Sequence, residues 1–149
     1  MVKVEASVDI NRPIEDVFAY VTDPAKKSEW SSLTLECTLE GSGPIGVGSR
    51  MRTIGKFLGR RLEFTAEVTQ YDPPSKFAMR EISSPGHFEI ERQLESIGEG
   101  TRYHSSLAGE SGGLFKLADP IVATVMQRTV ETDLHTMKAL LEAKVPSGA

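Results

Sequence analysis

The sequence of 149 residues lacks several features that would indicate a particular class of protein. It has one cysteine, Cys37, which excludes an intrachain disulfide. No uncharged apolar run approaches the roughly 18 residues that a membrane-spanning helix needs. Basic residues are not in excess either, with nine against eleven acidic residues in 1–75 and eight against ten in 76–149. We therefore expect no integral membrane association and no binding to nucleic acid, because a phosphate backbone attracts a basic surface.

The N-terminal residues also lack the continuous apolar core of a secretion signal, since Met1 to Glu5 alternate apolar and charged side chains. The composition is close to the globular average, at 39% hydrophobic and 26% charged residues. These features predict a cytoplasmic protein. We expect one domain over residues 1–145 and a disordered tail over residues 146–149.

Signatures of cofactor and metal chemistry are missing as well. The three histidines, His87, His104 and His135, have no metal-ligand spacing, so no metal site is expected. Residues 41–46 match the dinucleotide fingerprint G-x-G-x-x-G, but a strand pattern follows where that mechanism needs a helix. We interpret the segment as a glycine-rich loop. No cofactor is expected, and catalytic residues stay unassigned because spacing ties no nucleophile to a base.

What the sequence does contain is a long series of segments in which apolar and polar residues alternate. This period of two is typical of strands with one buried face. It occurs over residues 2–10, 33–39, 50–54, 62–68, 77–82, 88–94 and 103–107. Apolar residues spaced by three and four predict a short helix over 14–21, a second helical segment ending near Trp30, and a long helix over 120–143.

Neighbouring strands can be paired so that their apolar faces coincide. The pairing places Val68 opposite Phe77, Glu81 opposite Phe88, and Leu94 opposite Tyr103. Each hairpin then keeps its apolar side chains on one side, as antiparallel pairing requires. The pattern predicts an antiparallel meander with one buried face.

Several short motifs support a family resemblance. They are Ile10-Asn11-Arg12-Pro13, Asp23-Pro24 followed by Trp30, Val47-Gly48-Ser49, Tyr71-Asp72-Pro73-Pro74, Gly100-Thr101-Arg102 and Asp133-Leu134. With the order of predicted elements, they make the chain similar to the SRPBCC superfamily. That superfamily includes START-type lipid-transfer domains, birch-pollen-allergen-like proteins and polyketide cyclases/dehydrases.

The resemblance implies an α+β helix-grip fold. In this fold a curved seven-stranded antiparallel sheet wraps around a long C-terminal helix, and two short helices follow the first strand. A cavity lies between sheet and helix. A small hydrophobic or aromatic molecule is the expected ligand, for binding, transport or sensing, with no catalysis required. The alternative is a cofactor-independent aromatase/cyclase or dehydratase that folds a polyketide in the same cavity.

The strand register and the helix faces identify candidate ligand-binding residues. On the strands they are Met51, Phe64, Met79, Ile90, Arg92, Tyr103 and Ser105. On the C-terminal helix they are Ile121, Val122, Val125 and Thr129, with Ile121, Val122 and Val125 expected on a face displaced from the Met126–Leu141 seam. Trp30 is expected at the rim of the cavity, where a large ring with one polar atom suits ligand contact.

Arg92 interrupts the apolar alternation of its strand and is predicted to be buried. A buried guanidinium needs a charged or hydrogen-bonding partner. Two interpretations stay open: Arg92 holds an anionic group of a ligand, or it pairs internally with Glu81 or Asp133. The sequence also leaves open a homodimer and a protein-interaction module.

Overall fold

The computed structural model describes residues 1–83, 87–110 and 119–144. Seven strands form one antiparallel sheet in the order β1-β7-β6-β5-β4-β3-β2. They are β1 (Val2–Ile10), β2 (Thr34–Leu39), β3 (Arg50–Phe57), β4 (Arg60–Asp72), β5 (Lys76–Glu81), β6 (His87–Ile97) and β7 (Gly100–Glu110). The helices are α1 (Ile14–Thr22), the 3-10 turn η1 (Pro24–Lys26), α2 (Lys27–Trp30) and α3 (Asp119–Ala143).

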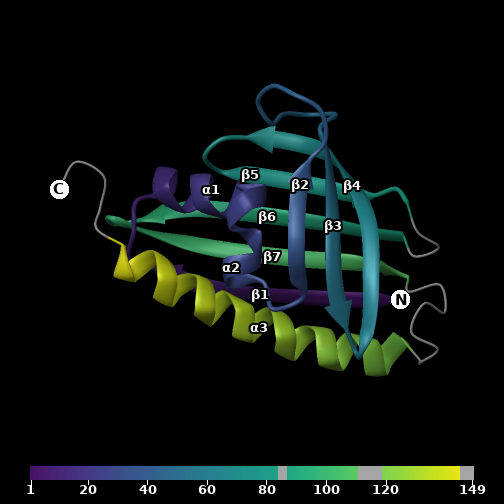
Figure 1. Ribbon diagram of the computed structural model, residues 1–149. Coiled ribbons are helices and arrows are strands. Elements are labelled where there is room, and N and C mark those ends of the chain that lie inside the picture. The colour runs from purple at the N-terminus through teal and green to yellow at the C-terminus, as the bar shows by residue number, and fades with distance from the viewer. Residues whose placement is uncertain (84–86, 111–118, 145–149) are drawn as a thin grey trace.

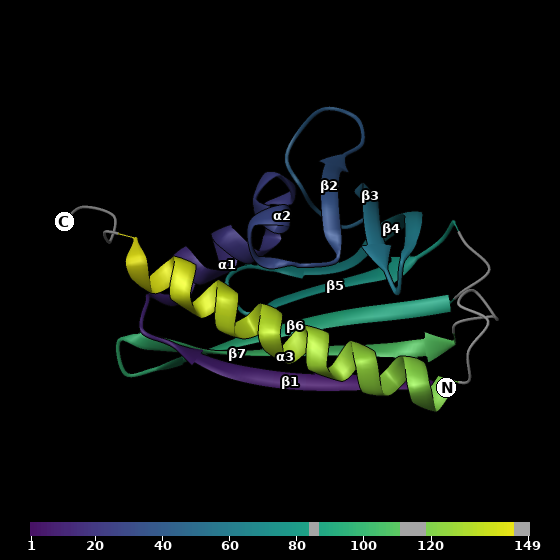
Figure 2. The ribbon, with the colours of Figure 1, turned by 60° about the horizontal axis from the view of Figure 1, so that its bottom comes forward.

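The sheet is strongly curved. In Figure 1, β2 and β3 run nearly across the direction of β1, β6 and β7, and α3 lies along the lower edge of the sheet. Figure 2 shows α3 crossing the hollow side of the sheet, with α1 and α2 towards the C-terminal end of α3. This is the helix-grip fold that the family resemblance implied. The predicted tail over 146–149 lies outside the described residues.

Most of the predicted register is confirmed. Met79 pairs with Ile90, Phe77 with Arg92, and Leu94 with Tyr103. The pairing of β4 with β5 was wrong by two residues, since Val68 lies opposite Met79 and not Phe77. An irregularity between Val68 and Gln70 adds a residue to β4, and the strands continue to the pair Asp72–Lys76. A shift of two residues leaves the same side chains on the buried face.

The turn between β1 and α1 holds the C-terminal end of α3. The buried Arg12 side chain donates from Nη1 to the carbonyl oxygens of Leu141 (2.7 Å) and Lys144 (3.0 Å). Its Nη2 donates to Asp16 Oδ2 at 2.8 Å. Because the last carbonyls of a helix have no partner within the helix, Arg12 satisfies groups that would otherwise be buried without a donor. The main hydrophobic core, which includes Phe18, Tyr103 and Met137, fills this end of the molecule.

Candidate ligand-binding site

A cavity of about 430 Å³ lies between the concave face of the sheet and α3. That volume is within the range of small-molecule pockets, roughly 300–1,000 Å³. Its wall is mainly apolar and draws on all seven strands, on α2 and α3, and on the segment after α2. The apolar wall residues are Val4, Leu33, Phe57, Leu62, Phe64, Phe88, Ile90, Leu107, Met126, Val130 and Leu134.

The cavity occupies the space that the two hydrophobic clusters leave between them. One cluster holds Trp30 and Leu134, the other holds Val4, Phe57 and Met126, and all five residues contribute to the cavity wall. On β3, the wall includes Gly55, where a Cβ atom would lie 2.5 Å from the carbonyl oxygen of Leu33. That close approach of two backbones admits only glycine.

Two cations and one aromatic ring form the inner end of the cavity. Arg92 on β6 is 7% exposed, and its Nη1 donates to the carbonyl oxygen of Val21 at 3.3 Å. Its guanidinium carbon lies 5.2 Å from the centre of the Trp30 ring, within the range of a cation–π contact. Nε of Arg92 is buried without a hydrogen-bond partner. In the described part of the chain Arg92 forms no ion pair, so neither internal pairing considered from the sequence is present.

Lys27, the first residue of α2, lies beside Arg92 on the same wall. Burial, and after it the positive charge of Arg92, lower the pKa of Lys27 to about 8, and Cys37 opposes the shift. The side chain is half-buried, and none of the hydrogen bonds and ion pairs between described residues involves it. The ammonium group of Lys27 is therefore a second cation without a counter-ion at the inner end.

Asp133 of α3 is an acidic group in the cavity wall. It is 5% exposed, and its Oδ1 accepts a hydrogen bond from the backbone N–H of Ser32 at 3.1 Å. Burial raises the pKa of Asp133, and the hydrogen bonds from Ser32 act in the opposite direction. The aspartate therefore binds a proton more readily than an exposed one.

The exposed wall residues mark the rim of the cavity within the described ranges. They lie on β3, β4 and the residues that follow β5: Lys56, Arg60, Arg61, Glu63 and Ser83. Three of them, Lys56, Arg60 and Arg61, are basic residues next to the β3–β4 turn. The rim is therefore mainly cationic.

Five of the residues selected from the sequence lie on the cavity wall: Trp30, Phe64, Ile90, Arg92 and Ser105. Trp30 was expected at the rim, and that position was wrong. It is 7% exposed and lies under Arg92, because α2 turns the ring inwards against the sheet.

Three other strand residues do not line this cavity. Tyr103 is fully buried in the main core, where α1 and the C-terminal half of α3 fill the concave face, and its hydroxyl has no hydrogen-bond partner. Burial raises the pKa of Tyr103, with Arg92 and then Ser105 acting in the opposite direction. Met51 and Met79 border a separate space of about 10 Å³ behind Lys27 and Arg92. That space holds about one water molecule.

The predicted face of the C-terminal helix was also wrong. Ile121 is 51% exposed, Val122 packs into the second hydrophobic cluster, and Val125 and Thr129 are half-buried, with Thr129 bonded to the carbonyl of Val125. None of these four lines the cavity. The cavity side of α3 is instead formed by Met126, Val130, Asp133 and Leu134. Successive helix residues are about 100° apart, so Ile121 and Val125 lie on the far side of Val122 from these positions.

Lys27 was missed by the sequence reasoning. The adjacent Lys26 has the same chemistry and pairs with Glu29 at 3.6 Å on the outside of the short helix. Nothing in the local pattern distinguishes the two lysines, because a helix of one turn has no readable periodicity. The sequence offers one signal for Lys27. It is a charged residue shortly before Trp30, and Trp30 was already expected to border the cavity.

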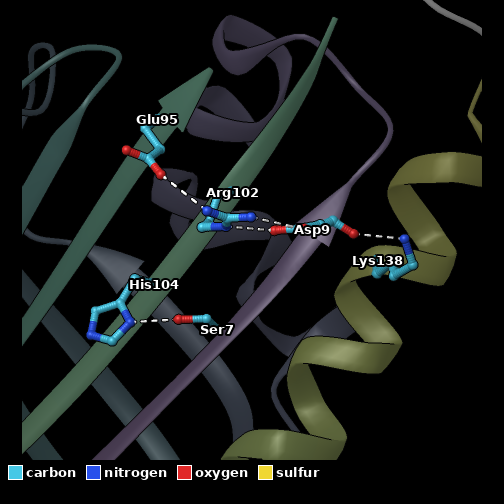
Figure 3. A network of polar contacts seen from close by, with 6 residues as sticks. All are labelled: Ser7, Asp9, Glu95, Arg102, His104 and Lys138. Carbon is cyan, nitrogen blue, oxygen red and sulfur yellow. Dashed lines mark hydrogen bonds and ion pairs between the residues drawn. The ribbon is translucent and has the colours of Figure 1, made fainter. Parts of the chain in front are cut away.

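A second polar cluster lies on the opposite face of the sheet (Figure 3). Arg102 on β7 donates to Asp9 on β1 at 2.9 Å, and Ser7 contacts His104 Nδ1 at 2.6 Å. Lys138 of α3 donates to the carbonyl oxygen of Asp9 at 2.6 Å. The hydrogen bond from Arg102 lowers the pKa of Asp9. These residues connect β1, β7 and α3 on an exposed surface and do not border the cavity.

Within the described ranges, no three His, Cys, Asp or Glu side chains are grouped so as to hold a metal ion. No described helix has the length and apolar character that crossing a membrane requires.

Comparisons with known proteins place this geometry in a family. A family model described as polyketide cyclase / dehydrase and lipid transport matches residues 1–142. No curated protein matches the chain. Among solved structures, the protein TTHA0849 from Thermus thermophilus is similar with a TM-score of 0.78 at 21% identity, over 95% of this chain and 97% of that one.

Two further structures show the same fold. A START superfamily protein from Mycobacterium smegmatis has a TM-score of 0.78 at 15% identity, over 94% of this chain and 97% of that one. Ara h 8.0201 has a TM-score of 0.67 at 12% identity, over 95% and 98% of the two chains. The fold is therefore that of START-like proteins, and the match over residues 1–142 shows that the chain belongs to the polyketide cyclase/dehydrase and lipid transport family.

Proposed function

We propose that the protein binds a small, mostly apolar molecule in the cavity between the sheet and α3. The observation that carries this proposal is the cavity of about 430 Å³, with an apolar wall and a few polar groups at its inner end. Burial of apolar ligand surface supplies the affinity, at about 25 cal/mol per Å², and the polar groups orient the ligand. Membership of a family that includes lipid transport supports the proposal. The cytoplasmic location stays a prediction.

The test uses a neutral solvatochromic dye, Nile red, with the purified protein. We expect saturable binding with a blue-shifted emission, and displacement of the dye by decanamide and by naphthalene. Native mass spectrometry of the purified protein would identify any small molecule that is retained. Dye emission that stays at its value in water, together with no bound mass, would contradict the proposal.

A cyclase or dehydratase is the second candidate, and one observation favours it. Burial shifts the pKa values of Asp133 and Lys27 in opposite directions from their ordinary values, and both groups border the cavity. Such shifts are typical of general acids and bases. Incubation with a polyketide mimic separates the two functions: a changed product mass indicates catalysis, and recovery of the intact mimic indicates binding alone.

A further inference from the structure

We propose that the cavity selects hydrophobic carboxylic acids, with the carboxylate held between Lys27 and Arg92 at the inner end. This proposal rests on the ligand-binding function proposed above and specifies the chemistry of its ligand. It assigns a role to Lys27, for which the sequence pattern predicted none.

The first argument is the hydrogen-bonding capacity of Arg92. A guanidinium has five N–H donors, and the structure gives Arg92 one hydrogen bond, from Nη1 to the carbonyl of Val21. The guanidinium carbon also lies over the Trp30 ring, 5.2 Å from its centre, and this contact supplies no hydrogen-bond acceptor. A carboxylate is the planar acceptor that matches a guanidinium, and it would supply the charge that buried Arg92 lacks.

The second argument is the position of Lys27 beside this group. Both side chains border the cavity and the small space behind it. Burial first, and the positive charge of Arg92 second, lower the pKa of Lys27, so its ammonium group lacks full compensation. A single bound anion would compensate both cations at once. A neutral ligand of the same shape would compensate neither.

The acidic groups of the wall do not replace such an anion. Arg92 pairs with Phe77 in the sheet register, and the backbone of Glu81 lies four residues further along β5, about 13 Å from that of Phe77 at the rise of a strand. No ion pair joins Glu81 to Arg92 in the described part of the chain. Asp133 accepts its hydrogen bond from the backbone N–H of Ser32, and no ion pair between described residues joins it to either cation. The inner end of the cavity is therefore cationic, and the apolar wall beyond it accommodates the hydrocarbon part of the acid.

The charge at the rim acts in the same direction. Lys56 and Arg61 are exposed at the opening and attract an anion from solution before it enters. This attraction weakens with added salt, whereas contacts with the buried Arg92 are screened less.

The experiment compares decanoic acid with decanamide as competitors of Nile red at pH 7. The two molecules have nearly the same shape and differ in charge. For the unaltered protein we expect the acid to bind at least about tenfold more tightly than the amide, as is typical of hydrogen bonds to charged groups. Lys27→Met and Arg92→Met should each reduce that preference to near unity by weakening the acid far more than the amide.

Lys26→Met is the matched control, because it removes the same charge from the adjacent residue, whose side chain pairs with Glu29 outside the cavity. It should keep the full preference for the acid. Binding of the amide by every variant reports an intact cavity, so a loss of acid binding cannot be ascribed to unfolding. Equal affinities for acid and amide in the unaltered protein would overturn the acid site alone. Retention of the preference in both Lys27→Met and Arg92→Met would overturn it as well. Failure of dye, acid and amide alike to bind would overturn the ligand-binding function and the acid site together.

Discussion

Single residues at the inner end of the cavity combine burial with incomplete compensation of charge. The side chain of Arg92 contacts the Trp30 ring and donates one hydrogen bond. The side chain of Lys27 forms no hydrogen bond and no ion pair with a described residue. Asp133 has a hydrogen bond from Ser32 and a pKa raised by burial. Such groups cost folding free energy, and they are typical of functional sites.

Substitution of Arg92 tests this description by its effect on stability. Removing one partner of a buried ion pair typically costs about 3–5 kcal/mol. Because Arg92 forms no ion pair with a described residue, we expect Arg92→Met to leave the melting temperature of the ligand-free protein unchanged or to raise it. Thermal melts followed by circular dichroism measure the effect. A fall in melting temperature that corresponds to a loss of several kcal/mol in the free energy of unfolding would contradict this description. It would show that another group of the protein balances the charge of Arg92.

Asp133 gives a prediction for the dependence of stability on pH. Its pKa is raised in the folded state, so the folded protein holds this proton more tightly than the unfolded chain. The resulting stabilisation is present below the unfolded-state pKa and is lost as pH rises through the folded-state pKa. At pH 7 Asp133→Asn should therefore increase the free energy of unfolding, and the difference from the unaltered protein should shrink towards pH 4.

Urea unfolding at several pH values measures this difference. Glu131→Gln, which neutralises an exposed acid on the same helix, should show no comparable trend. A variant that is less stable than the unaltered protein at pH 7 would show that the Asp133 charge is stabilising and would contradict this account.

At the scale of elements, the C-terminal end of α3 depends on the β1–α1 turn. Arg12 satisfies two carbonyl oxygens of the helix end, and the backbone N–H of Asn11 donates to Glu142 Oε2 at 2.8 Å. The carbonyl oxygen of Arg12 in turn accepts from Thr101 on β7 at 2.8 Å. The helix is thereby fixed against the sheet at the end opposite the rim of the cavity.

We expect Arg12→Met to lower the free energy of unfolding by about 2–4 kcal/mol, because it leaves buried carbonyl groups without a donor. Hydrogen exchange should become faster at the C-terminal end of α3 before it does elsewhere in the helix. Arg128→Met removes an arginine from the same helix that is not part of these contacts, and it should change stability by less than about 0.5 kcal/mol. Equal effects of the two substitutions would show that the Arg12 contacts are not stabilising.

At the scale of the whole molecule, sequence patterns and the family resemblance together were sufficient for the fold but only partly for the site. Alternation identified the buried face of most strands, and a register error of two residues in β4 did not alter that face. At the start of β2 the alternation was wrong, since Leu35 is 58% exposed and Thr34 is buried, because the register with β3 shifts at this point. The alternation of apolar and polar residues could not show that Phe64 and Ile90 border a cavity while Tyr103 lies in the core. That distinction depends on how far α1 and α3 fill the concave face, which is a non-local property.

The helix was harder to orient than the strands, because apolar residues occur on more than one side of α3. Val122 and Met126 are both buried, yet Ile121 is exposed. Only the position of α3 over the sheet shows that the polar Asp133 faces the cavity. Lys27 was missed for a similar reason, since the orientation of one helical turn is set by its packing.

The central claim is that a ligand occupies the cavity between sheet and helix, and a matched pair of variants on β7 tests it most directly. Ser105 borders the cavity, whereas the next residue, Ser106, belongs to the opposite face of the sheet. Ser105→Trp should fill part of the cavity and weaken Nile red binding at least about tenfold, in line with the cost of overpacking a filled site. Ser106→Trp should bind the dye as the unaltered protein does. Equal binding by both variants would place the ligand outside this cavity and contradict the account.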